Sequence, residues 1–407
     1  MTTLNSPYQV LLTANLAYFP YVKAFIKNFI SFHRSPVRFI VIHNHPDPQD
    51  PAIQDLVQSF SSLDFVEVKP HFGDPEILRR WKLPEEHIAN PQNLRLLLPT
   101  LPYHGRVVYF DLDIMFTSPV DELFTDPDLL QGKGLAASAD LCMYLEIYQR
   151  YGFFAKIGEP EIMLEKNFGV NNYYFNSGFL VIDVDKLRTG PSIDDNKWAQ
   201  QIWDCYQFYL PCPDQDFLNI VHNDDKVILN VKYNYCGLIL TDQRFYLYDA
   251  KWQNSYTQAK EQGKIPDFFP KVIHFYKTNY KQWNHLCPEW QELYQHFANF
   301  DLAQLTTTSV EDFITLMHNF FKQYHYDMAS GDYSPNHDVL GISLQSVRKQ
   351  VAKAKSWQIP QIFLNPNLYR MGSLRKFRLK YLGNERQREK FALKLSQKLH
   401  APISKLK

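Results

Sequence analysis

RVVYFDLDIMFTSPVDELF, the stretch at residues 106–124, decides which fold the sequence predicts. The apolar run at 107–110 is typical of a buried strand in a parallel sheet, because such strands are apolar on both faces. Asp111 and Asp113 follow the run directly, so they lie at its carboxyl end. Residues two apart in extended backbone point to the same side, and both carboxylates are therefore expected to face one crevice. Open α/β sheets bind their ligands at this end of the strands.

The two carboxylates allow two interpretations. Mg²⁺ and Mn²⁺ take oxygen ligands and are commonly held by one or two carboxylates together with substrate phosphates. The alternative is a solvated turn, since the pattern D-x-D is common in sequences of every kind. An apolar strand precedes the pair and a turn at Ser118-Pro119 follows it. With this context the metal site and the solvated turn are about equally favoured. Both interpretations stay open on these residues alone.

Strands and helices alternate on both sides of this stretch. Short apolar runs indicate strands, and apolar residues at helical spacing indicate the helices between them. This alternation predicts an α/β fold with a parallel sheet and right-handed crossovers. The expected strands are 8–12, 37–42, 63–68, 135–139, 178–182 and 272–275, and the expected helices are 19–32, 52–60, 92–98, 196–208 and 215–222.

Three other segments depart from the alternation. Residues 69–91 carry many prolines and charges and are expected to be irregular. Residues 144–174 are rich in aromatic residues and glycine, and we interpret them as an active-site insertion. From residue 288 onward the pattern is helical, with a loop near 328–337. We therefore expect an α/β domain at 1–284 and a mainly helical C-terminal region at 285–407.

Charge is balanced over the whole chain but not along it. Lys plus Arg and Asp plus Glu number 43 each, so the total charge indicates no nucleic-acid partner. Residues 371–407, the basic tail, contain eleven Lys or Arg against two Glu, a net charge of +9 that leaves −9 for the rest. Within residues 382–399, leucines and Phe391 lie among these basic residues. We expect the tail either to dock on an anionic membrane surface or to form a solvated helix.

Cysteine usage and the amino terminus indicate the cell compartment. Five cysteines at irregular spacing, with no C-x-x-C pair, argue against a disulfide framework or a zinc site. The amino terminus has no basic residue before Lys23 and no continuous apolar run, unlike a secretory signal. No run approaches the length of a membrane span. A cytoplasmic location is the resulting expectation, with peripheral membrane contact through the basic tail.

Five segments occur in an order that resembles one known family. They are LLTANLAYFPYV at 11–22, NLRLLLPTLPYHGRVVYFDLDIMF at 93–116, YFNSGFLVIDV at 174–184, PDQDFLNIV at 213–221 and VIHFYKTNYKQW at 272–283. Together they resemble glycosyltransferase family 8, the group that contains glycogenin and bacterial lipopolysaccharide glucosyl- and galactosyltransferases, over roughly residues 9–283. Five motifs in order are far more specific than any one of them.

The resemblance implies both a fold and a function. The fold is GT-A, in which a Rossmann-like, mostly parallel sheet flanked by helices binds a nucleotide sugar with a divalent metal. The function is transfer of a hexose, with retention of anomeric configuration, from a nucleotide sugar to a glycan, lipid-linked or protein acceptor. UDP is the expected nucleotide. Residues 1–284 would form the catalytic domain, and 285–407 its helical extension with the basic tail.

The resemblance also implies which residues hold the metal and the nucleotide. The metal, Mn²⁺ or Mg²⁺, would be held by Asp111, Asp113 and His274. An imidazole beside carboxylates suits Mn²⁺, although an isolated histidine is more often structural. Tyr18 would stack on uracil and Lys281 would bind the diphosphate. The positions that resemble the family's nucleotide-sugar contacts are Thr13, Asn15, Tyr18, Arg95, Asp111 and Lys281. For Arg95 the alternative is an ordinary surface charge on a helix.

The donor sugar has its own set of candidate catalytic residues. Asn176, Asp214 and Gln215 resemble residues that line the sugar pocket, and Gln215 would lie nearest the anomeric carbon. Asp214 could otherwise be the N-cap of the helix expected at 215–222.

The sequence departs from the family at three positions. Asn15 replaces a family aspartate and Ala17 a family asparagine. Lys277 stands where the family has glycine, and Lys281 and Trp283 come one residue late. An inserted residue explains this shift and leaves Lys281 as the diphosphate-binding cation.

Two other functions compete with the glycosyltransferase. A sugar-nucleotide pyrophosphorylase would need a Gly-rich basic loop after the first strand, and LLTANLAYFP contains neither glycine nor a basic residue. A carbohydrate- or nucleotide-sugar-binding protein without turnover is suggested by the changed loop after His274. The 25 tyrosines and the likeness to glycogenin add self-glucosylation on tyrosine as a minor hypothesis.

Overall fold

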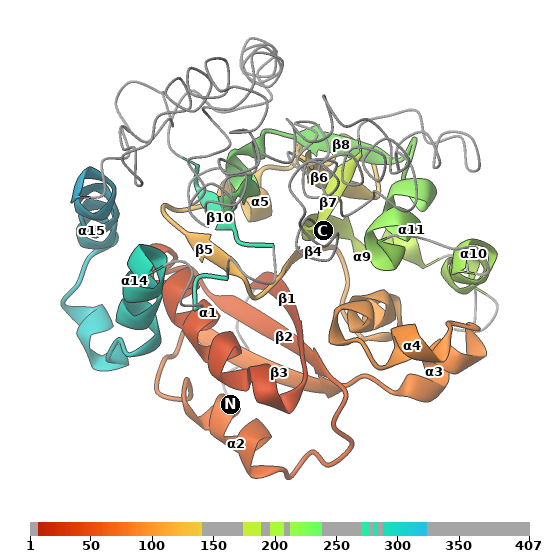
Figure 1. The fold of residues 1–407 in the computed structure, drawn as a ribbon, viewed down its shortest axis with the longest axis horizontal. Helices are drawn as coiled ribbons and strands as arrows, with labels where there is room; N and C mark the ends of the chain where they lie inside the picture. Colours follow the sequence, from red (N-terminus) through yellow and green to blue (C-terminus); the bar gives the residue numbers. More distant parts are fainter. Residues whose placement is uncertain are drawn as a thin grey trace, which may run out of the picture.

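A seven-stranded sheet forms the centre of the molecule (Figure 1). The computed structural model of the 407-residue chain describes residues 7–140, 174–188, 196–206, 212–237, 270–276, 281–283 and 288–323. Among them the strand order is β3-β2-β1-β4-β7-β6-β8. These strands are β1 (Tyr8–Ala14), β2 (Val37–His43), β3 (Val66–Phe72), β4 (Arg106–Phe110), β6 (Leu135–Ala139), β7 (Phe175–Asp183) and β8 (Lys226–Leu229).

The strands of this sheet run in one direction, with β7 as the exception. β1 pairs parallel with β2 and β4, β2 with β3, and β6 with β8. β7 is antiparallel to both β4 and β6. The predicted α/β fold with a mostly parallel sheet is confirmed, while the strand predicted at 178–182 lies in the reversed β7. This reversal brings the amino end of β7, with Asn176 and Gly178, beside the carboxyl end of β4.

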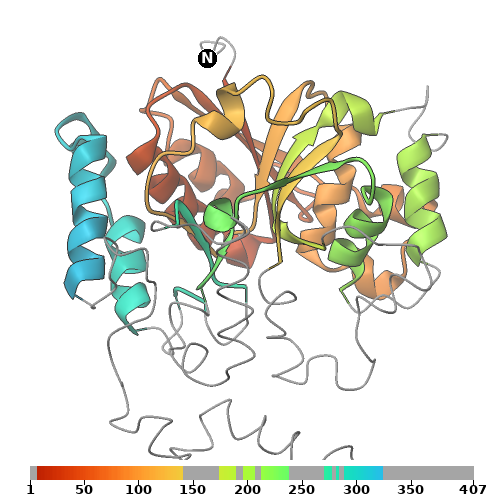
Figure 2. The same ribbon diagram turned by 90° about the horizontal axis from the view of Figure 1, so that it is seen from above.

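Helices cover both faces of the sheet (Figure 2). One face packs against α1 (Phe19–Phe32), which in turn contacts α14 (Pro288–Ala298) and α15 (Val310–Gln323). The other face packs against η2 (Pro91–Thr100), α10 (Lys197–Tyr206) and α11 (Pro213–Val221). The remaining helices are η1 (Leu16–Tyr18), α2 (Pro51–Gln58), α3 (Pro75–Arg80), α4 (Glu85–Ile88), α5 (Glu122–Thr125), α9 (Val184–Leu187), η3 (Val231–Tyr233) and η6 (Leu302–Thr306).

The two helical layers explain why the strands are apolar on both faces. In β1, Val10 and Leu12 belong to the core cluster on the α1 side, and Leu11 belongs to the cluster on the η2 side. Alternate residues of a strand point to opposite faces, so a strand covered twice has no solvent-facing position. The apolar run that predicted β4 has the same cause, since its residues 107–110 are buried on both sides.

A second, three-stranded sheet has the order β5-β10-β9. β5 (Ile114–Phe116) continues from the two aspartates and pairs antiparallel with β10 (Val272–His274), which pairs parallel with β9 (Tyr235–Cys236). The register sets His274 opposite Ile114. This sheet therefore brings a residue from the last part of the fold next to the Asp111-Asp113 loop.

Segment 69–91 is more regular than predicted. β3 extends to Phe72, and α3 and α4 follow. Asp74 caps α3, because its carboxylate accepts a hydrogen bond from the backbone N–H of Glu76 at 2.9 Å. Pro75 takes the first helical position, where a missing N–H loses no hydrogen bond. Proline here starts a helix, so the prediction that this segment is irregular is wrong.

Several expectations concern residues outside the described ranges. These are the insertion predicted at 144–174, of which Tyr174 alone is described, the loop at 328–337, Lys277 and the basic tail. The domain boundary near residue 284 stays a prediction. Within the described part of the chain, none of the helices is both long and apolar enough to cross a membrane.

Candidate metal centre

Asp111 and Asp113 occupy a loop that is fixed at both ends. The strand β4 ends at Phe110, and the backbone N–H of Asp111 donates to the Gly178 carbonyl of β7 at 2.8 Å. The Asp113 carbonyl accepts from the Phe275 N–H at 2.8 Å, just past β10. Leu112 lies between the two aspartates and points back into the core, as predicted. The loop geometry is therefore set by backbone bonds to two neighbouring strands.

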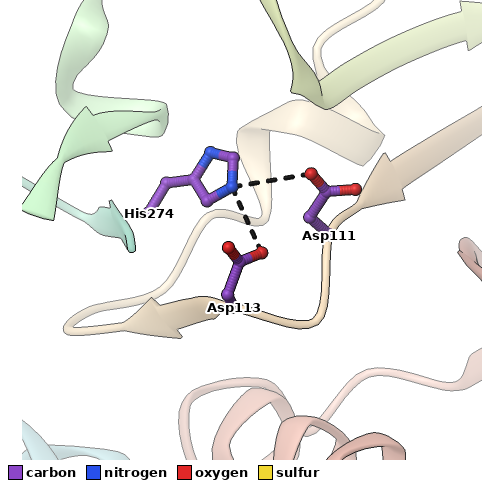
Figure 3. Close-up of side chains that lie close together, drawn as sticks. All are labelled: Asp111, Asp113 and His274. Atoms are coloured by element: carbon purple, nitrogen blue, oxygen red, sulfur yellow. Dashed lines mark ion pairs between the residues drawn. The ribbon is translucent and has the colours of Figure 1, made fainter. Parts of the chain in front are cut away.

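His274 completes a group of three metal-ligating side chains (Figure 3). Its Nε2 lies 3.5 Å from Asp111 Oδ2 and 3.3 Å from Asp113 Oδ1. One ligand atom from each residue lies within 4.8 Å of the others. His274 is 1% exposed, and its Nε2 has no hydrogen-bond partner among the described residues. A buried nitrogen that makes no hydrogen bond and faces two carboxylates at ion-pair distance fits a divalent metal that accepts nitrogen and oxygen ligands.

The charges of the group support the same conclusion. Burial opposes ionisation of Asp113, but Lys281 and His274 hold the pKa of this carboxyl well below its usual range. The pKa of Asp111 is lowered as well, because His274 and Arg95 outweigh the effect of burial. Burial lowers the pKa of His274, yet the charges of Asp113 and Asp111 raise it to about 9. Both carboxylates are thus ionised near neutral pH, while His274 must lose a proton to bind a metal.

Arg95 lies inside the site. It is 5% exposed, so the alternative of a surface helix charge is wrong. One guanidinium nitrogen donates to the Ser177 carbonyl at 2.6 Å and lies 3.8 Å from Asp111 Oδ1, and the other pairs with Asp214. The guanidinium also lies over the Tyr109 ring, 4.6 Å from its centroid. Arg95 therefore ties α11 to the metal-ligating loop.

Asn176, Asp214 and Gln215 lie together on the same side of the site. Gln215 Oε1 accepts from the Ser177 N–H at 3.0 Å, and its Nε2 donates to Asp140 and to the Tyr174 hydroxyl, each at 3.1 Å. Asn176 Nδ2 also donates to Asp140, at 3.2 Å. Both amide side chains are thus held in one orientation around a shared carboxylate.

Asp214 does not cap its helix. The helix α11 begins at Pro213 and its N-cap is Cys212, so the predicted start at residue 215 was two residues late. Proline favours the first helical position, and this places Asp214 in the first turn instead of at the cap. Its carboxylate accepts from Arg95 and from Gln92 Nε2, the latter at 3.0 Å.

Three of the residues expected at the nucleotide lie at or just after the carboxyl end of β1. Thr13 Oγ1 lies 3.3 Å from the Tyr109 hydroxyl. Asn15 Oδ1 is buried and has no hydrogen-bond partner among the described residues. Tyr18 is 44% exposed, which leaves its ring accessible for stacking. Lys281 is ion-paired with Asp113.

Three residues of the site were missed in the sequence. Tyr109 donates a hydrogen bond to Asp111, and its ring lies under the Arg95 guanidinium. Because it belongs to an apolar strand, the sequence pattern does not distinguish it from a core residue. Asp140 directly follows the strand 135–139, as Asp111 follows 107–110, so the same pattern could have found it. Asn234 Oδ1 accepts a hydrogen bond from His274 Nδ1 at 2.9 Å, and no sequence signal marks this residue.

Comparison with known proteins places this arrangement in a family. The family model for glycosyl transferase family 8 matches residues 9–287. The bifunctional glycosyltransferase WbbM is 18% identical, with a TM-score of 0.53 over 76% of this chain. This chain spans 53% of the WbbM chain, about half its length. The galactosyltransferase LgtC, solved with donor and acceptor sugar analogues, is 20% identical, with a TM-score of 0.50 over 73% of this chain and 98% of its own. No curated protein matches the chain. These structures show a shared GT-A fold.

Proposed function

The chain belongs to glycosyl transferase family 8, whose members are retaining hexosyltransferases, and we propose that it transfers a hexose from a UDP-linked sugar in a metal-dependent reaction. The proposed acceptor is a glycan, a lipid-linked sugar or a protein. The observation that carries the proposal is the group Asp111, Asp113 and His274, where a buried Nε2 that makes no hydrogen bond faces two carboxylates at ion-pair distance. LgtC, a galactosyltransferase of the same fold, is consistent with a hexose as the transferred group.

The three ligands would hold Mn²⁺ or Mg²⁺. When bound, the metal supplies positive charge beside the diphosphate, which stabilises it as a leaving group. Asp111 and Asp113 are ionised over the physiological range, as ligation requires. Lys281 is the second cation proposed for the diphosphate, and its present partner Asp113 lies at the metal site itself.

The chain's own side chains orient the donor. Tyr18 is exposed and would stack on the base, while Thr13 and Asn15 would contact the nucleoside from the end of β1. Gln215 and Asn176 are held by Asp140 and would bind the sugar hydroxyls. In a retaining transfer the departing phosphate oxygen can take the acceptor proton. The proposal therefore needs no side-chain base, and Asp214 serves to hold Arg95.

Release of UDP tests the proposal directly. The purified chain is incubated with a panel of UDP-sugars and Mn²⁺, with and without EDTA. We expect UDP release from at least one UDP-hexose and loss of that release in EDTA. Release that is unchanged in excess EDTA would overturn the metal-dependent mechanism. Formation of UTP from a UDP-sugar and pyrophosphate would support a pyrophosphorylase, and donor binding without any UDP release would support a binding protein.

A further inference from the structure

Asn234 connects the candidate metal centre to the proposed sugar site. It follows η3 and precedes β9, the strand that pairs with β10 and sets Cys236 beside His274. Its side chain is 1% exposed. Asn234 Oδ1 lies 2.9 Å from His274 Nδ1, and Asn234 Nδ2 donates to Asn176 Oδ1 at 3.0 Å. The amide oxygen therefore bonds the metal-ligating His274, and the amide nitrogen bonds Asn176 of the proposed sugar site.

The orientation of the Asn234 amide follows from a backbone group. The N–H of Gly178 donates to Asn176 at 3.0 Å, and a backbone N–H can only donate, so the Asn176 atom that it meets must be the oxygen. That same oxygen faces Asn234, which must then present its NH₂ group there. The Asn234 oxygen is left to face His274. An oxygen of an amide only accepts, so His274 Nδ1 must carry the hydrogen.

This hydrogen determines which nitrogen of His274 is free for a metal. A neutral imidazole carries one N–H, and with that hydrogen on Nδ1 the lone pair lies on Nε2. Nε2 is the nitrogen that faces Asp111 and Asp113. Gly178 packs against the Cε1 edge of the ring: a Cβ added there would lie 2.1 Å from His274 Cε1. The ring is thus bounded by Gly178 and held by Asn234.

We propose that Asn234 is a positioning residue for the metal site, which fixes the His274 ring with its Nε2 lone pair aimed between the two carboxylates. The same amide joins His274 to Asn176. Asn176 donates to Asp140, which also accepts from Gln215, so metal ligand and sugar site share one hydrogen-bonded chain. Partners of this kind hold metal-binding histidines in place, and losing one weakens metal binding by about ten- to a hundredfold. The inference rests on the metal dependence proposed above.

The test is the affinity for Mn²⁺ itself. In the full chain, Asn234→Leu keeps the size of the side chain and removes both bonds, whereas Asn234→Asp keeps an oxygen acceptor for His274. Free Mn²⁺ is titrated with each variant and measured by its electron paramagnetic resonance signal. We expect Asn234→Leu to weaken Mn²⁺ binding by about tenfold or more. Asn234→Asp should lose less affinity than Asn234→Leu, because one carboxylate oxygen still accepts from Nδ1 while only the bond to Asn176 is lost.

Asn28→Leu is the matched control. Asn28 is also a buried asparagine with both amide ends bonded, in this case to the N–H and carbonyl of Phe116 in β5. It lies outside the hydrogen-bonded chain. Both leucine variants should lower the temperature of unfolding in EDTA, but Asn28→Leu should bind Mn²⁺ like the wild type. This comparison separates a loss of stability from a loss of metal affinity.

Four outcomes would overturn the inference. Equal Mn²⁺ affinity in wild type and Asn234→Leu would show that Asn234 does not act through His274. An equal loss in Asn28→Leu would show a general effect of stability, and a loss in Asn234→Asp as large as in Asn234→Leu would contradict the acceptor role. A wild type that binds no Mn²⁺ would overturn the proposed metal dependence as well. Failure of the inference alone would instead leave a wild type that binds Mn²⁺.

Discussion

Gly178 is the residue at which the smallest change should do most damage to the candidate metal centre. In Gly178→Ala, the added Cβ would lie 2.1 Å from His274 Cε1 and 2.7 Å from Asp111 Oδ2. Carbon atoms in contact lie about 3.5–4.0 Å apart, so the imidazole would have to retreat by about 1.4 Å or more. The backbone cannot absorb the shift easily, because the Gly178 carbonyl accepts from Asp111 N–H and its N–H donates to Asn176.

The expected effect is large on activity and moderate on stability. Overpacking of this kind costs about 1–3 kcal/mol of the free energy of unfolding. A displacement of about 1 Å in a catalytic arrangement can lower the rate roughly a hundredfold. We therefore expect Gly178→Ala to fold, to bind Mn²⁺ weakly and to lose about two orders of magnitude in UDP release. Electron paramagnetic resonance titration and a UDP-release assay measure these two quantities.

Gly73→Ala is the control for overpacking. Its added Cβ would meet Leu94 at 2.8 Å and Ile42 at 2.9 Å, which are apolar groups away from the three metal ligands. It should lower the temperature of unfolding while leaving Mn²⁺ affinity unchanged. If Gly178→Ala instead bound Mn²⁺ and turned over like the wild type, the packing of His274 against Gly178 would be refuted, and with it the rigid ligand geometry.

Four further predictions concern the metal, pH, the basic tail and tyrosine. Asp113→Asn should lower kcat by about a hundredfold or more, since it removes one charge and little volume, and normal turnover would count against ligation. The pKa of His274 is raised from 6.5 to about 9, so in EDTA its contribution to stability should be full below pH 6.5 and be lost as pH rises through about 9, in unfolding measured by calorimetry. Over the same range Mn²⁺ should bind more tightly as pH rises, and titrations showing no pH dependence would contradict this. If the basic tail docks on an anionic membrane and is not a solvated helix, truncation after Gly372 should abolish sedimentation with anionic liposomes; no loss on truncation, or equal binding to neutral vesicles, would argue against docking. Intact mass after incubation with UDP-glucose and Mn²⁺ should rise by whole hexose units if a tyrosine is the acceptor, and an unchanged mass removes that hypothesis.

The sequence predicted those features that depend on local pattern. β4 and the two aspartates after it were predictable. A strand with helices on both faces is apolar throughout, so the first charged residues show where it ends. The position of His274 came from the resemblance, and the structure brings it to the aspartates through β10. That Asp111, Asp113 and His274 bind a metal remains a proposal, and the Mn²⁺ titrations test it.

Features that depend on contacts between distant segments were not predictable. The reversed direction of β7 has no local signal, because a strand is equally apolar in either direction. Arg95 belongs to a short helix whose pattern does not show that its guanidinium reaches Ser177 and lies over Tyr109. Asn234 has partners 58 and 40 residues away, so its role is visible only in the folded chain.

The packing of α1 limits how far the chain can be shortened. Phe32 lies 6.2 Å from Phe297 and 6.1 Å from Phe313, measured between ring centroids, and all three side chains belong to one buried cluster. Lys27 donates to the carbonyls of Ala298 and Phe300, at 3.0 and 2.8 Å. A fragment ending at residue 287, where the family match ends, would leave this side of α1 facing water and Lys27 without these acceptors. We therefore expect a soluble, active fragment to need the residues up to the end of α15.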